Sequence, residues 1–453
     1  MGKANTIHWV FVPFIILVLI YAVFKALLDG PDVDLYLTAS RKLCLGENLY
    51  SDYIYVDNYL YSPFFALLMV PLTWLSDPFA RVIWALLNLA LTVRLWLLLR
   101  RLLTSGFNLK INYLHAWSIG ILILSLGFLN HNLILGQITI VILWLTLEGL
   151  HLVFSGENLK GSALLALGIN IKILPIIAVF YLFFKWKIRA LIYIFLFSLS
   201  FLFLPALFFG LDYNTYLLGQ WKNTINPVGE RYNLERGIGC NSLNAILPAY
   251  FYDFGDEADN DFHGFKRKIA SVSAEKLSWG LNITRVLLLC SVWLLVFHQT
   301  NQRKGREPIF FYWEFAYLML VSYLIFPHQM KYAMLYFVPA GGYMWLYFLV
   351  LVKQKWKGSM AQIGTAVFSV FLLLLLSIMG RDLIGDYWVD LFGYYHVMGL
   401  ICIIFLMFLL IVKPERLVAL SGSFQKDHIS HAPHCTSDRS SSTGHDESHL
   451  PNG

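Results

Sequence analysis

Long apolar runs separated by short polar segments dominate the chain. Runs long enough, or nearly long enough, to cross a bilayer occur at residues 8–28, 79–99, 114–129, 133–154, 190–209, 281–298, 309–326, 332–352, 361–379 and 394–412. The run 159–184 is longer, but Asn170 and Lys172 lie at its centre and Pro175 follows at once. A proline breaks the helical hydrogen-bond ladder and a lone lysine in lipid is costly, so this run predicts two short half-helices. The pattern predicts an all-α polytopic membrane protein with about 12 transmembrane helices, two of them short.

The apolar segment 62–76 is too short for a span, which needs roughly 20 residues, and it contains two prolines. As a surface helix it lets residues 79–99 deliver Arg100 and Arg101 to the cytoplasm, as the positive-inside rule requires. A short tilted span is the alternative. With 62–76 on the surface, the other basic clusters (185–189, 303–306, 353–357 and 413–416) and both termini also fall inside. We therefore expect interfacial helices on the outer face, a first outer loop at 29–78 and a large outer loop at 210–280.

Composition supports a membrane protein and excludes several other classes. The chain is 58% hydrophobic and only 14% charged, whereas soluble domains carry about 25% charged residues. Topology accounts for the net charge of +6 without nucleic acid. The five cysteines have neither disulfide-framework nor zinc-site spacing. Residues 1–420 are read as one transmembrane domain and the Ser/His-rich residues 421–453 as a disordered cytoplasmic tail. The tail histidines could bind a metal weakly, but their irregular spacing favours a solvated tail.

Acidic, basic and amide side chains gather on the expected outer side. The first loop contributes Asp32 and Asp34, the half-helix break contributes Lys172, and later turns contribute His328 and Lys331. This one-sided concentration indicates a site that faces the outer leaflet. Individual amides can equally cap helices or face water.

Several motifs, in order along the chain, carry a family resemblance. The stretch DVDLYLTASRKLCLGENLYSDY, followed by NYLYSPFFALLMVPL, resembles the opening of family 87 of the GT-C glycosyltransferases, also called the DUF2029 family. NLILGQITIVIL, GINIKILPIIAVFYLFFKWKIRAL, GCNSLNAIL and FPHQMKYAMLYFVP continue the likeness over most of residues 25–350. The chain departs from the family pattern at Phe326-Pro327-His328, where a small residue often precedes the proline. It departs again at Gly239-Cys240-Asn241-Ser242, in the amide motif.

This resemblance implies a GT-C-type bundle that transfers a hexose, often mannose, from a polyprenyl-phosphate donor. The acceptor, a glycolipid or glycan, binds on the exoplasmic side, and the catalytic carboxylate lies in the first outer loop. Asp34 occupies the position of the family aspartate and is the expected base, because a positioned carboxylate can take the proton of a sugar hydroxyl during an inverting displacement. Asp32 is expected to orient the acceptor or to cap the helix that begins near Val33.

The remaining site residues follow from the needs of a lipid-phosphate leaving group and a sugar. Cationic and hydrogen-bonding groups stabilise the departing phosphate; the candidates are Lys172, His328, Lys331, Arg231 and Arg236. Sugar or acceptor contacts are assigned to Tyr36, Tyr61, Gln137, Asn241 and Gln329. Lys172 has a structural alternative as an ion-pair partner. No cofactor is required, and a divalent metal at the two acids remains open.

Two rival functions remain at this point. A transporter or flippase of lipid-linked sugars usually shows repeated halves with charges at matching midplane positions, and we find no internal repeat. A scaffold subunit would not need the cluster of aspartates and lysine. We expect a multi-pass enzyme of the plasma membrane.

Overall fold

Helices make up most of the described part of the chain. The computed structural model describes residues 17, 20–21, 23–51, 59–104, 111–225, 234–237, 239–255, 262, 264–300, 308–356 and 358–418. Within these ranges there is no strand, only an isolated bridge between Phe262 and Phe265. The prediction of an all-α polytopic membrane protein is confirmed, because six of the described helices are long and apolar enough to cross a bilayer.

The first half of the chain folds into helices of very different lengths. They are α2 (Pro31–Leu45), α3 (Pro63–Met69), η1 (Val70–Trp74), α4 (Asp77–Thr104), α5 (Ile111–Leu135), α6 (Thr139–Phe154), α7 (Asn158–Ile171), α8 (Ile176–Phe184), α9 (Ile188–Phe203), α10 (Ala206–Phe209) and α11 (Leu211–Thr224). The second half contains α13 (Leu243–Phe251), α15 (Ala274–Thr300), α16 (Pro308–Ile325), η2 (Lys331–Phe337), α17 (Val338–Lys353), α18 (Met360–Ile378), α19 (Arg381–Tyr394) and α20 (Val397–Ile411).

The described residues contain fewer candidate spans than the sequence predicts for the whole chain. Within the described residues, six helices are long and apolar enough to cross a membrane, or seven if the bent pair α19–α20 forms one span. The expected count of about 12 is not confirmed. The expected first span, 8–28, lies largely outside the described residues. Residues 62–76 form α3 and η1, which are too short to count as a span.

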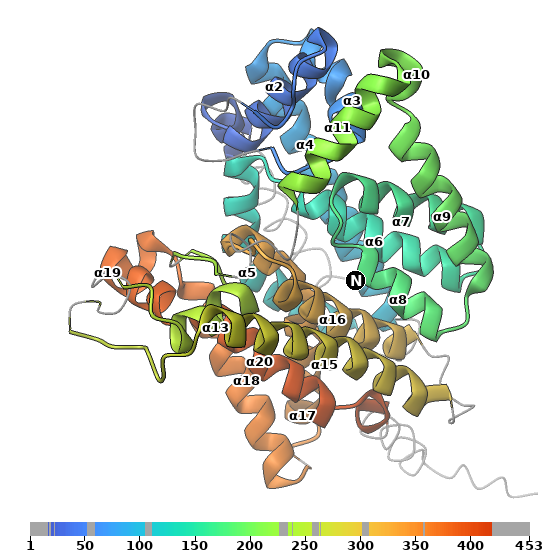
Figure 1. The fold of residues 1–453 in the computed structure, drawn as a ribbon. Helices are drawn as coiled ribbons and strands as arrows, with labels where there is room; N and C mark the ends of the chain where they lie inside the picture. The colour runs from blue at the N-terminus through green and yellow to red at the C-terminus, as the bar shows by residue number, and fades with distance from the viewer. Residues whose placement is uncertain are drawn as a thin grey trace, which may run out of the picture.

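The break in the run 159–184 occurs where the sequence predicts it. Helix α7 ends at Ile171, Lys172 is extended, and Pro175 precedes α8. The chain then returns to the end of the bundle where it began, since the Lys187 ammonium lies 5.0 Å from the ring centroid of Phe154, at the end of α6. Both half-helices are confirmed. They lie beside α6 and α9 in Figure 1.

The turn after α5 comes later than predicted. The sequence suggests that a helix ends near residue 129, but α5 runs unbroken to Leu135. The chain reverses only at Gly136, whose φ of +71° lies in the left-handed region that glycine adopts without strain. The turn therefore lies in the last part of the polar stretch LNHNLILGQ, with Gln137 just beyond it.

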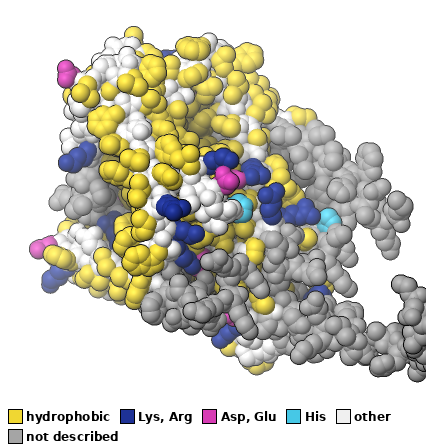
Figure 2. All heavy atoms as spheres, turned by 90° about the vertical axis from the view of Figure 1, so that its right-hand side faces the viewer, with side chains coloured by type: hydrophobic (Ala, Val, Ile, Leu, Met, Phe, Trp, Pro, Cys, Tyr) yellow, Lys and Arg dark blue, Asp and Glu magenta, His cyan; other side chains and the backbone are white. Residues whose placement is uncertain are grey.

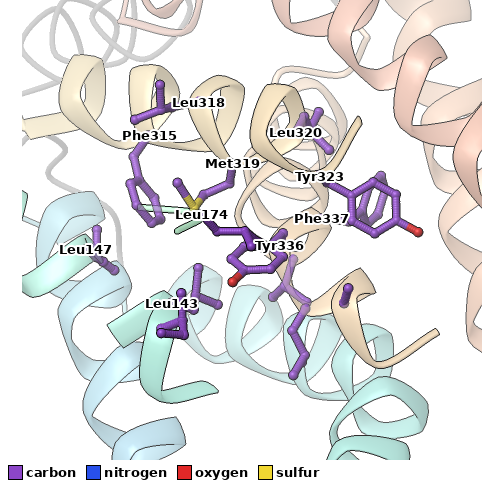
Figure 3. Packing of buried hydrophobic residues seen from close by; sticks show 14 of the residues in the cluster. Leu143, Leu147, Leu174, Phe315, Leu318, Met319, Leu320, Tyr323, Tyr336 and Phe337 are labelled. Atoms are coloured by element: carbon purple, nitrogen blue, oxygen red, sulfur yellow. The ribbon is translucent and has the colours of Figure 1, made fainter. Parts of the chain in front are cut away.

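The interior and the apolar surface are made by different helices. In the apolar 18-residue stretches of α16 and of η2–α17, 78% is buried inside the protein. In the corresponding stretch of α9–α10, only 11% is buried. Figure 3 shows Leu174, from the α7–α8 break, among Phe315 and Met319 of α16 and Tyr336 of η2. Figure 2 shows a broad hydrophobic face with Lys and Arg side chains at several places on it. An exposed apolar surface of this extent fits contact with lipid.

Candidate active site

The two acids of the first loop stand in the first turn of α2 but have different partners. Gly30 and Pro31 start this helix, and carboxylates are favoured near its positive end. The Oδ2 atom of Asp32 accepts a hydrogen bond from Gln137 Nε2 at 2.7 Å. Asp34 instead accepts from Arg81 through both of its oxygens, with Nε at 2.8 Å. The two acids, two positions apart, thus have different hydrogen-bond partners.

A close approach between α2 and the α5–α6 turn brings Gln137 to Asp32. A Cβ atom at Gly136 would lie 2.4 Å from the Val33 side chain, so only glycine fits there. The carbonyl of Gly136 also accepts a 2.7 Å hydrogen bond from the Trp84 indole. Gly136 therefore allows the turn to approach α2 closely, and Gln137, the next residue, makes the hydrogen bond to Asp32.

Lys172 is held in place by the start of α3. The Ser62 hydroxyl accepts from Phe65 N and donates to the Asn170 carbonyl, two residues before Lys172. The Lys172 ammonium lies 5.7 Å from the Tyr61 ring centroid and 5.8 Å from that of Tyr332. Cations are attracted to aromatic faces at such distances.

Lys172 also interacts electrostatically with Asp32. The first loop, the α7–α8 break and η2 thus meet at one point. Three segments that are distant in sequence form one polar site.

The tyrosines divide into core and site residues. Tyr36 is fully buried, its ring centroid 5.0 Å from both Tyr61 and Phe65. Burial raises the pKa of Tyr36 well above its ordinary value. Its hydroxyl lies 3.1 Å from that of Tyr61. Tyr36 therefore supports Tyr61 from within, and Tyr61 is the ring that faces Lys172.

A second layer joins the 326–331 turn to the segment before α13. The carbonyl of Gln329 accepts a 2.8 Å hydrogen bond from Asn241 N, and both residues are buried. Glu235 Oε1 accepts from His328 N at 2.7 Å. The Tyr332 hydroxyl donates to the His328 carbonyl at 3.3 Å. Through Tyr332, the turn that carries His328 adjoins the residues around Lys172.

Other predicted cations lie elsewhere or are not described. Lys331 donates to the Met379 carbonyl at 3.0 Å, at the end of α18. The Arg236 guanidinium lies 4.7 Å from the ring centroid of Phe254. Arg231 lies outside the described residues.

Sequence reasoning missed three residues of this region. They are Arg81, Glu235 and Tyr332. Arg81 is hidden in the sequence at the start of an apolar run, and Glu235 in a mixed polar loop.

One group of side chains among the described residues has the composition of a metal site. Glu235, Cys240 and His328 bring possible ligand atoms within 4.8 Å of one another. However, Glu235 Oε2 already accepts from Ser242 at 3.1 Å, and its Oε1 accepts from His328. Burial raises the pKa of Cys240 to about 12, which disfavours the thiolate that a metal needs. The hydrogen bonds account for this group without a metal.

These features define a polytopic membrane protein whose polar site holds a lysine that interacts electrostatically with a carboxylate. The family model of glycosyltransferase family 87 matches residues 59–306, more than half of the chain, and the chain belongs to this family. The resemblance that the motifs predict is thereby confirmed, and the protein is a membrane glycosyltransferase. No curated protein matches the chain. Asp32 and His328 lie outside the matched range, so their contacts carry the argument for their roles.

Proposed function

We propose that this glycosyltransferase moves a hexose, with mannose the first choice, from a polyprenyl-phosphate donor to a glycolipid or glycan acceptor on the outer face. The observation that carries the proposal is the Lys172 ammonium, which lies 5.7 Å from the Tyr61 ring centroid and interacts electrostatically with Asp32. A base, a cation and aromatic rings are the groups that a lipid-phosphate sugar transfer requires.

Asp32, instead of the expected Asp34, is the base. Both oxygens of Asp34 accept hydrogen bonds from Arg81, so a proton taken up by this carboxylate would break a charge-assisted pair. Asp32 accepts from the neutral amide of Gln137 and interacts with Lys172. Asp34 then has a supporting role, because its pair with Arg81 ties α2 to α4. The choice reverses the preference that the motif position suggests.

The reaction needs one base and no general acid. Asp32 takes the proton of an acceptor hydroxyl as its oxygen forms a bond to the anomeric carbon. The bond from that carbon to the phosphate oxygen breaks on the opposite face, so the configuration inverts. The electron pair leaves with the polyprenyl phosphate, which is acidic enough to depart unprotonated. Lys172 and His328 offset its charge, and Tyr61 contacts the sugar.

The proposal includes a location for the site. Basic clusters at residues 185–189 and 353–357 favour the cytoplasmic side, which leaves the half-helix break on the outer face. Both termini are then cytoplasmic, and residues 1–420 form one domain in the plasma membrane. Helices α3 and η1 lie along the outer interface.

The test is donor cleavage by purified protein in lipid nanodiscs. Polyprenyl-phosphate mannose, glucose and galactose are each supplied with a membrane lipid extract as the source of acceptor, and released polyprenyl phosphate is measured. We expect release with one donor and its loss in Asp32→Asn. Turnover that survives in Asp32→Asn but not in Asp34→Asn would restore Asp34 as the base. Movement of an uncleaved lipid-linked sugar across proteoliposomes would favour a flippase instead.

A further inference from the structure

We propose that Glu235 is a positioning residue that holds His328 in the orientation in which its imidazole binds the donor phosphate; this rests on the proposed function. Glu235 Oε1 accepts the backbone N–H of His328 at 2.7 Å and lies 3.1 Å from the Nδ1 atom of the same residue. Its Oε2 accepts from the Ser242 hydroxyl at 3.1 Å. One carboxylate thus fixes both the main chain and the ring of His328.

The main chain of His328 needs such support because its conformation is unfavourable. Its φ of +57° lies in the left-handed region, which costs energy for a residue with a side chain. The surroundings oppose this cost at three points: Glu235 accepts the N–H, Tyr332 donates to the carbonyl, and the next residue is bonded to Asn241. Strain that is held in place by several contacts is typical of functional positions.

The exposed fractions of the two side chains indicate that Glu235 supports His328, and not the reverse. The Glu235 side chain is 2% exposed, whereas that of His328 is 39% exposed. A buried carboxylate is costly unless it is well partnered, and here one half-exposed histidine supplies both a backbone hydrogen bond and a ring nitrogen 3.1 Å away. A carboxylate at Nδ1 orients an imidazole, leaves its Nε2 to meet a ligand and favours its positive form.

The donor phosphate is the ligand that suits the side of the site formed by His328, Tyr332 and Lys172. Tyr332 contacts the carbonyl of His328 through its hydroxyl, and its ring centroid lies 5.8 Å from the Lys172 ammonium. His328 and Lys172 therefore flank the same tyrosine. Two cationic groups on one wall bind an anion, while the base Asp32 interacts with Lys172 from α2.

The experiment compares Glu235→Gln with wild-type protein in two assays: steady-state kinetics and direct binding of polyprenyl phosphate by native mass spectrometry. Glutamine keeps an oxygen for the His328 N–H but cannot favour a charged ring. We expect the donor KM and the polyprenyl phosphate Kd to rise about 10-fold, as when a supporting partner is removed, with kcat changed much less. Asp253→Asn is the matched control, because Asp253 pairs with Lys268 at 2.6 Å in the same loop region.

A double-mutant cycle with His328→Gln separates positioning from general damage. If Glu235 acts through His328, adding Glu235→Gln to His328→Gln weakens polyprenyl phosphate binding no further. If Glu235→Gln does not fold, Glu235→Asp replaces it: its shorter side chain cannot reach both His328 atoms, so Kd must still rise.

Three outcomes overturn the proposal. The first is an unchanged Kd in Glu235→Gln, and the second is additive effects in the double-mutant cycle. The third is zinc bound to the wild-type protein, if Cys240→Ser loses both the zinc and the binding of polyprenyl phosphate. Wild-type protein that binds polyprenyl phosphate with no release from any donor contradicts the proposed function alone.

Discussion

A lysine lies near a carboxylate and a tyrosine at each end of helix α8. Only in the group after the helix does the carboxylate accept hydrogen bonds from both the lysine and the tyrosine. After the helix, Lys185 donates to Glu314 at 2.6 Å and lies 5.6 Å from the Tyr181 ring centroid, while the Tyr181 hydroxyl donates to the other Glu314 oxygen. Before the helix, Lys172 lies against two aromatic rings, and Asp32 acts on it from another element. The same residue types are assembled in two ways.

The difference separates a structural ion pair from a binding site. Glu314 is 6% exposed and accepts hydrogen bonds on both oxygens, so this group is satisfied without any ligand. A buried pair of this kind is costly to break on one side. Around Lys172 two ring faces attract the cation, and Asp32 interacts with it electrostatically from α2. Such a lysine can still bind an anion.

Replacing Asp32 with Asn is expected to have the largest effect. The amide keeps the shape and the contact with Gln137 but cannot take a proton, so kcat falls by about 10²–10⁴-fold. Single-turnover release of polyprenyl phosphate measures this, with donor binding as a check on folding. In Asp34→Asn the Arg81 pair is weakened instead, and we expect only a several-fold loss. Equal losses in the two variants contradict the distinction between the acids.

Replacing Lys172 with Met tests the proposed anion-binding role of the lysine that precedes α8. The loss of a charged partner for the phosphate raises the donor KM by about 10–100-fold, since one charge-assisted hydrogen bond disappears. Thermal unfolding in detergent should change little. A variant that binds donor normally but melts much earlier than wild type indicates a structural lysine and refutes the comparison at this end.

At the Lys185–Glu314 pair after α8, substitution should lower stability and leave turnover nearly unchanged. Lys185→Met leaves Glu314 without its cation and costs about 3–5 kcal/mol of stability, whereas the double variant Lys185→Met, Glu314→Leu recovers most of it. Turnover measured below the melting temperature should stay near the wild-type value in the double variant. A loss of turnover at full stability would show that this pair, too, has a functional role.

The smallest expected effect concerns pH and sharpens the view of Glu235. Burial is the main cause that raises its pKa from 4.5 to about 7. The unfolded chain therefore releases the proton before the folded protein does, and stability falls as pH rises from about 4.5 to about 7. The groups that face Glu235 are Ser242, His328, Cys240 and Arg285. Melting curves across this range should show a drop of a few degrees in wild type and a flatter profile in Glu235→Gln.

Local chemistry allowed much of the fold to be predicted. Apolar run length gave the long helices, and Lys172 followed by Pro175 gave the break between α7 and α8. The end of α5 was misplaced because the polar residues after 129 suggested a turn, whereas packing allows the helix to continue to Gly136. The predicted span count counted apolar runs, including 8–28, that the described structure does not test or does not present as full-length helices.

Sequence order and motif likeness determined the family, the membrane class and the list of candidate polar residues, because these depend on composition and on neighbours along the chain. Only the tertiary structure decided which of those residues meet. Asp32 and Asp34 are two positions apart in one helical turn, yet Gln137 reaches one and Arg81 the other. Glu235 and His328 are joined across 93 positions. Such pairings arise from the packing of separate helices, and no local pattern records them.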